Sequence, residues 1–125
     1  MSGSLTKKKI LVLDQDWRML STINQISEHG DFDIHIIYDS NSVYQKAKFI
    51  SPDLIILDYL LIGNDCGLIC QDLKDDELLH TIPIIIVTAF KTSKVKLDAY
   101  RYDALFVKPL DMNVLATRID YLMAS

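Results

Sequence analysis

Four polar residues, each directly after an apolar run, are the candidates for chemistry in this sequence of 125 residues: Asp14, Asp58, Thr88 and Lys108. Two carboxylates about 5 Å apart repel each other by roughly 3 kcal/mol at an effective dielectric near 20, so such a pair needs a compensating cation. Mg2+ is the natural one, because it binds one or two carboxylates together with water and phosphate. A hydroxyl and an ammonium nearby would bind the other phosphoryl oxygens, which indicates a phosphate held against an aspartate or attached to it.

Buried strands are predicted to position these residues. The apolar run 54–57 follows Pro52 and ends at Asp58 without alternation, which is typical of a strand buried on both faces of a parallel sheet. The second and fifth predicted strands are shorter or partly alternating, which favours edge positions. The predicted strands are 10–13, 32–37, 54–57, 84–87 and 104–107.

Helical periodicity between the strands predicts five helices. Asp111 is expected to cap the last, and Ser40 or Asn41 the second. Leu68 and Val114 are expected to face the sheet. The first helix follows Asp16 and ends before Gly30; the others are predicted at about 41–50, 67–74, 92–100 and 111–123, with a loop from Tyr59 to Cys66.

Alternating strands and helices predict an α/β fold with right-handed crossovers and a doubly wound parallel sheet. The apolar content makes the first, third and fourth strands central, which gives the order 2-1-3-4-5 of flavodoxin-like folds. The carboxyl ends of parallel strands share one edge, so the four polar residues are expected to converge there. We expect a single domain over 7–124, with 1–6 a disordered segment or a cloning remnant.

Composition excludes several classes of function. The net charge of −4 argues against direct binding of nucleic acid or anionic membrane by this domain. No apolar run approaches the roughly 18 residues of a membrane span. Cys66 and Cys70 are the only cysteines, too few for a structural zinc site, and we expect a reduced, cytoplasmic protein.

From about Lys8 to Met123 the sequence resembles a receiver domain of a bacterial two-component response regulator. The resemblance implies that Asp58 accepts a phosphoryl group from the phosphohistidine of a sensor kinase or a phosphotransfer protein. It implies a Mg2+ site formed by Asp14, Asp58 and the backbone carbonyl of Leu60. Thr88 would bind the phosphoryl group and switch conformation, and Lys108 would pair with it. The matching stretches are 10–14, 52–58, 84–89 and Lys108-Pro109, the last resembling the family's cis peptide.

Two departures from the family pattern bear on these roles. Gln15 stands where the family usually has a second metal-binding acid, with Asp16 as a substitute ligand. Leu105 stands at the family's switch aromatic; Phe106 is one position away and is expected on the opposite face of the sheet.

The resemblance implies a phosphorylated regulatory domain and not an enzyme, with at most slow self-phosphorylation and self-dephosphorylation. A homodimer or an output domain is expected to use the helices at 92–100 and 111–123. The sequence does not distinguish a stand-alone receiver from part of a larger regulator or hybrid kinase.

Two alternatives stay open. A phosphatase of the haloacid-dehalogenase type would use Asp14 as nucleophile and Asp16 as general acid, but this leaves Asp58 unexplained. A receiver-like interaction module with weak or no phospho-switching is suggested by Gln15 and Leu105.

Overall fold

Five strands form one parallel sheet in the order β2-β1-β3-β4-β5, as predicted. The computed structural model describes residues 7–14, 20–59, 64–89 and 101–124. The strands are β1 (Lys8–Asp14), β2 (Phe32–Ile37), β3 (Leu54–Tyr59), β4 (Ile84–Thr88) and β5 (Ala104–Val107). The three most apolar strands are central, and β2 and β5 form the edges.

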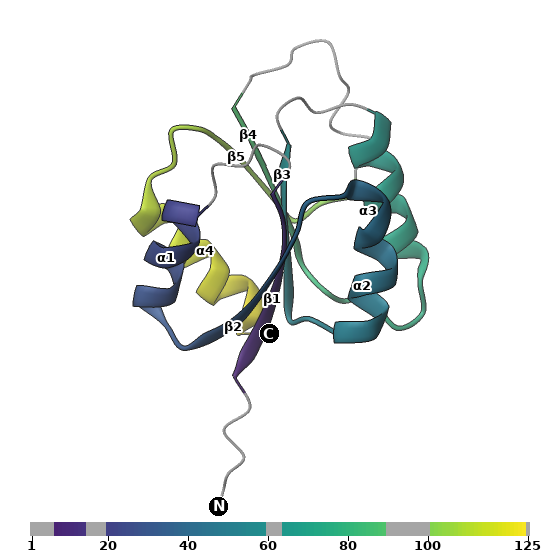
Figure 1. The fold of residues 1–125 in the computed structure, drawn as a ribbon, viewed down its shortest axis with the longest axis horizontal. Coiled ribbons are helices and arrows are strands. Elements are labelled where there is room, and N and C mark those ends of the chain that lie inside the picture. Colours follow the sequence, from purple (N-terminus) through teal and green to yellow (C-terminus); the bar gives the residue numbers. More distant parts are fainter. Residues whose placement is uncertain (1–6, 15–19, 60–63, 90–100, 125) are drawn as a thin grey trace, which may run out of the picture.

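Helices cover both faces of the sheet: α1 and α4 lie on one side, and α2 and α3 on the other (Figure 1). The helix predicted at 92–100 lies outside the described residues, so α4 is the helix predicted at 111–123. The helices are α1 (Leu20–His29), α2 (Val43–Ile50), α3 (Asn64–Asp75) and α4 (Met112–Met123), with a 3-10 turn, η1 (Ser40–Ser42), before α2.

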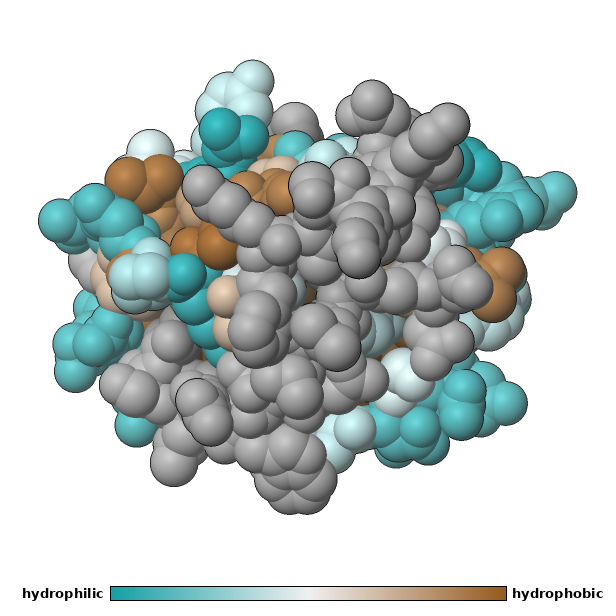
Figure 2. All heavy atoms as spheres, turned by 90° about the horizontal axis from the view of Figure 1, so that it is seen from above, coloured by the Kyte–Doolittle hydropathy of each residue, from teal (hydrophilic) through white to brown (hydrophobic). Residues whose placement is uncertain are grey.

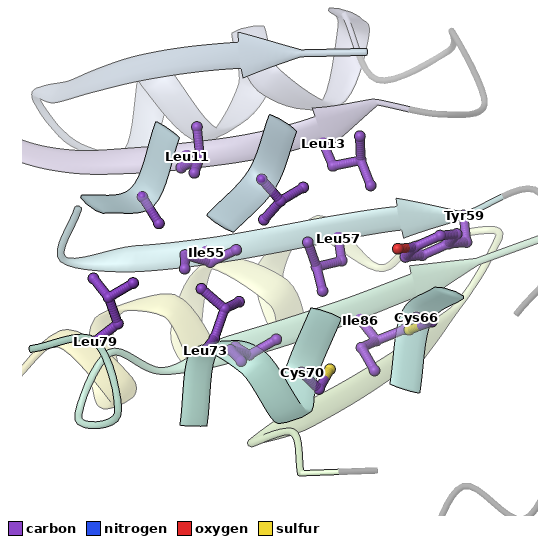
Figure 3. Close-up of a cluster of buried hydrophobic side chains, with 13 residues drawn as sticks. Leu11, Leu13, Ile55, Leu57, Tyr59, Cys66, Cys70, Leu73, Leu79 and Ile86 are labelled. Carbon is purple, nitrogen blue, oxygen red and sulfur yellow. The ribbon is translucent and has the colours of Figure 1, made fainter. Parts of the chain in front are cut away.

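The covered sheet gives the protein two apolar cores. Successive residues of the central strands alternate between these cores, which is why each strand is apolar throughout. The α2–α3 core contains Leu11, Leu13, Val43, Ala47, Ile55, Leu57, Tyr59, Cys66, Cys70, Leu73, Leu79, Ile84 and Ile86 (Figure 3). The α1–α4 core contains Ile10, Val12, Ile23, Ile26, Leu54, Ile56, Ile85, Val87, Ala104, Leu115 and Ile119.

Two aspartates fasten the amino ends of the strands. Asp53 Oδ2 accepts a hydrogen bond from Lys9 N at 2.8 Å, and Asp53 N donates to Lys9 O at 2.8 Å. Asp103 repeats the arrangement on β4, with Oδ2 accepting from Ile84 N at 2.7 Å and its own N donating to Ile84 O at 2.8 Å. Each pair of bonds fixes the register of two neighbouring strands, and therefore also what lies at their far ends.

The predicted cap of the second helix was wrong. Asp39 accepts from Asn41 N at 3.0 Å and from Ser42 Oγ at 3.2 Å, so the cap precedes a 3-10 turn that the helical pattern did not show. The cap predicted for the last helix is confirmed, since Asp111 accepts from the backbone of Asn113 and Val114.

Two residues predicted to face the sheet are exposed instead. Leu68 is 58% exposed, because the buried stripe of α3 runs along Cys66, Cys70 and Leu73. Val114 is 52% exposed, because the stripe of α4 is centred on its neighbour Leu115. In both helices an apolar residue lies just beside the stripe that packs.

The surface fits a fold whose apolar residues are mostly inside. Figure 2 shows the molecule from the carboxyl ends of the strands, with mostly hydrophilic and a few hydrophobic side chains on the two flanks. Within the ranges that the structure describes, no helix has the length and apolar character needed to cross a membrane.

Candidate functional site

Neighbouring strands bring Asp14 and Asp58 side by side. The two residues are aligned partners in the β1–β3 ladder, so their side chains leave the same face of the sheet. Strands in a sheet lie about 4.8 Å apart, which makes the carboxyl groups close neighbours. Asp58 is fully buried and Asp14 is 4% exposed. Two buried carboxylates in contact are unfavourable unless positive charge compensates them.

Lys108 supplies part of that charge from the edge of the sheet. Its Nζ lies 2.9 Å from Asp58 Oδ2, and the side chain of Lys108 is 21% exposed. The backbone N of Lys108 donates to Thr88 O at 2.8 Å, which continues the β4–β5 pairing and holds the lysine at the carboxyl edge. The Lys108-Pro109 peptide is cis, as the sequence comparison implied. The predicted convergence of Asp14, Asp58 and Lys108 is thus found.

Thr88 ends β4 and is 1% exposed. In register it pairs with Tyr59, one position beyond Asp58, so it lies at the same edge but not in the row that carries the acid. Its contact with a phosphoryl group stays a prediction. The ligand roles predicted for Gln15, Asp16 and Leu60 lie outside the described residues.

The donor set at this edge fits a hard divalent cation. Among the described residues, Asp14 Oδ1 is buried and accepts no hydrogen bond. Two carboxylates face one ammonium, so the group of Asp14, Asp58 and Lys108 carries a net negative charge when all three are ionised. No cluster of three or more His, Cys, Asp or Glu that could hold a metal occurs within the described ranges. Mg2+ suits such a site, since it keeps several waters and needs only one or two carboxylates.

Tyr59 is a residue of this edge whose place the sequence analysis missed. We expected it to begin a loop, whereas it is the last residue of β3 and is 2% exposed. Its ring lies beyond Leu57 at the carboxyl end of the strand, in the α2–α3 core (Figure 3). The alternation of Ile55, Leu57 and Tyr59 was the signal that could have placed it.

The prediction for Leu105 and Phe106 is confirmed. Leu105 packs against the α2–α3 core and Phe106 against the α1–α4 core, so the two point to opposite faces. The aromatic ring of β5 therefore does not occupy the face expected for the family's switch residue.

Comparisons with known proteins agree with this geometry. A family model described as the response regulator receiver domain matches residues 10–120. The response regulator ArlR of Staphylococcus saprophyticus is 35% identical over 114 residues, which cover 89% of this chain and 50% of ArlR. The chain spans about half the length of the first curated relatives it matches.

Solved structures show the same fold. A response regulator from Chloroflexus aurantiacus has a TM-score of 0.81 and 21% identity, covering 96% of this chain and 100% of that one. The receiver domain of the sensor histidine kinase PA1611 from Pseudomonas aeruginosa, solved with a magnesium ion coordinated in its active site cleft, has a TM-score of 0.77 and 16% identity over 96% of this chain and all of that one. With a family match over nearly its whole length, the chain belongs to the response regulator receiver domains.

Proposed function

We propose that Asp58 of this signalling domain is the residue that accepts the phosphoryl group, from the phosphohistidine of a sensor kinase or a phosphotransfer protein. The observation that carries the proposal is the alignment of buried Asp58 with Asp14 on one side and its ion pair with Lys108 on the other. A carboxylate oxygen of Asp58 forms the O–P bond as the N–P bond breaks in line. The imidazole nitrogen keeps the bonding pair and takes up a proton.

The neighbouring residues have separate roles in this proposal. Asp14 and Asp58, with the Leu60 carbonyl and Gln15 or Asp16, would hold Mg2+, which neutralises charge on the phosphoryl oxygens when bound. Lys108 pairs with a phosphoryl oxygen, and the Thr88 hydroxyl donates to another. Binding of magnesium in the PA1611 receiver domain supports the choice of metal.

Partners and setting follow from the same proposal. Residues 7–124 act as one domain, which signals through a homodimer or an output domain at α4 and the helix predicted at 92–100. Any catalysis by the chain itself is limited to slow self-phosphorylation and self-dephosphorylation. We place the protein in the cytoplasm, where free thiols such as Cys66 and Cys70 stay reduced.

Acetyl phosphate with Mg2+ tests the phosphoacceptor. Wild type should gain one phosphoryl group, which mass spectrometry of proteolytic peptides assigns to Asp58. Asp58→Asn should not be labelled, because an amide is not a nucleophile here. Asp72→Asn, at an exposed position of α3, is the matched control and should label as wild type does. Lys108→Ala should still be labelled but should lose the conformational response to the phosphoryl group.

Each other result has a defined meaning. A label on Asp14 that persists in Asp58→Asn would favour the phosphatase alternative. No label, together with unchanged stability in Mg2+ and beryllofluoride, would favour a receiver-like interaction module without phospho-switching. Both results contradict the role given to Asp58.

A further inference from the structure

We infer that Tyr59 transmits the state of Asp58 and Thr88 to α3, so that the α2–α3 side of the protein responds to phosphorylation. The inference rests on the proposed function of Asp58. It concerns a residue that positions other groups, since nothing places the Tyr59 ring on the phosphoryl group itself.

Tyr59 is connected to the site in two ways. It follows Asp58 directly in the chain, and it is the aligned partner of Thr88 in the β3–β4 ladder. Adjacent residues of a strand point to opposite faces. Asp58 therefore points to the α1–α4 side, where it meets Lys108, while Tyr59 points into the α2–α3 core. A displacement at either Asp58 or Thr88 acts on the position of the Tyr59 backbone or ring.

The ring is buried in the core that α2 and α3 form with the sheet. Tyr59 is among the largest fully buried side chains, and it shares its core with Cys66, Cys70 and Leu73 of α3 (Figure 3). Close-packed interiors do not deform continuously, so a shifted ring requires the helix above it to repack. This makes α3 the element that receives the change.

Leu105 and Phe106 of β5, at and beside the family's switch position, are less well placed than Tyr59. Leu105 lies on the same face but pairs with Ile86, two residues before Thr88. Phe106 lies on the opposite face, where it is partly buried and packs against the α1–α4 core. Tyr59 alone among these three joins the row of Thr88 to the packing of α3.

The two cysteines supply a built-in readout. Cys66 and Cys70 are the only cysteines of the chain. Both belong to α3 and are fully buried on the side of the helix that faces the sheet. Their reaction with a thiol reagent therefore requires α3 to open, and its rate measures the free energy of that opening.

The experiment compares labelling rates of the full chain with and without Mg2+ and beryllofluoride, an analogue of the phosphoryl group. In wild type the analogue should change the rate by about tenfold or more, equivalent to about 1.4 kcal/mol in the free energy of opening. Tyr59→Phe keeps the ring and should keep the response. Tyr59→Leu should lose it. Phe106→Leu, which replaces an aromatic ring by the same side chain on the opposite face of the sheet, is the control and should respond as wild type does.

Two results would overturn the inference: unchanged thiol labelling in a wild-type protein that acetyl phosphate does label at Asp58, or a full response in Tyr59→Leu. Failure of the acetyl phosphate reaction itself would instead overturn the proposed function. If Tyr59→Leu does not fold, Tyr59→Met tests the same point with a flexible apolar side chain.

Discussion

The two aspartates of the site differ in the groups that compensate their negative charge. Asp58 has an ammonium 2.9 Å away, whereas Asp14 Oδ1 has no hydrogen-bond donor within the described residues. The two acids are alike in sequence and in depth, yet within the described residues only Asp58 has an ion pair. Lys108 thus compensates the charge of Asp58, and we expect Asp14 to be the acid that attracts a cation.

A second acid, Asp76, carries a prediction about pH. It accepts hydrogen bonds from the Tyr44 hydroxyl and from Leu78 N at 2.8 Å, and it pairs with Lys48 Nζ at 3.1 Å. These contacts, the Tyr44 hydrogen bond first, lower the pKa of Asp76 to about 2. A carboxyl whose pKa is lower in the folded state stabilises the fold above its unfolded pKa, near 4, and this contribution is lost as the pH falls toward 2.

Asp76→Asn should therefore unfold at lower urea than wild type at pH 7. The difference should shrink as the pH falls from about 4 toward 2, because wild type loses the same charge by protonation. Urea titrations at pH 7, 4 and 3 measure it, with Asp72→Asn as the control. A difference between Asp76→Asn and wild type that stays constant down to pH 3 would contradict this role of the charge.

At the scale of the elements, the hydrogen bonds between Asp53 and Lys9 at the amino end of β3 should contribute to the free energy of unfolding. Asp53→Ala removes the acceptor of the Lys9 amide and should cost about 1–2 kcal/mol of unfolding free energy, since a partly buried donor loses a charged partner. Asp53→Asn keeps a carbonyl oxygen and should cost less. Urea unfolding gives both values, and exchange of the Lys9 amide shows whether the loss is local. Equal stability of Asp53→Ala and wild type would show that the bond adds nothing.

Strands were more predictable than caps and helix faces, for a physical reason. An unbroken apolar run such as 54–57 is readily predicted as a buried strand, because a strand covered on both faces is apolar at every position. The cap at Asp39 depends on a 3-10 turn of three residues, too short to leave a period in the sequence. Leu68 lies beside the stripe of α3, and its exposure is decided by how the helix is rotated on the sheet, a tertiary effect.

For the whole molecule, the sheet order and the shared edge were predictable, whereas pairings across the edge were not. Strand composition placed Asp14, Asp58 and Lys108 at one edge of the sheet. That Lys108 pairs with Asp58 and not with Asp14 depends on strand register and twist. The hydrogen bond from Tyr44 and the ion pair of Lys48 connect α2 to Asp76 in the turn after α3. No local sequence pattern predicts these contacts.

The site should lower the stability of the molecule in the absence of metal. Asp14→Asn leaves Asp58 and Lys108 as a neutral pair and relieves a repulsion of roughly 3 kcal/mol at an effective dielectric near 20. We expect the variant to be about 1–3 kcal/mol more stable than wild type in EDTA. Mg2+ should stabilise wild type by binding only its folded state, and should stabilise the variant much less.

Urea unfolding in EDTA and in excess Mg2+ checks both parts. Asp120→Asn, at an exposed position of α4, is the control for a change in net charge. A variant that is less stable than wild type in EDTA would mean that Asp14 has a stabilising partner that outweighs the repulsion.

The fastening of β3 at Asp53 has a consequence for how such a chain can vary in length. Asp53 fixes one end of the strand against β1, and Asp58 must arrive opposite Asp14 at the other. One residue inserted or deleted at 54–57 would turn the acid to the wrong side of the sheet, although the helices could still form. Related chains should therefore differ in the length of their connecting segments, while the count from Asp53 to Asp58 stays the same.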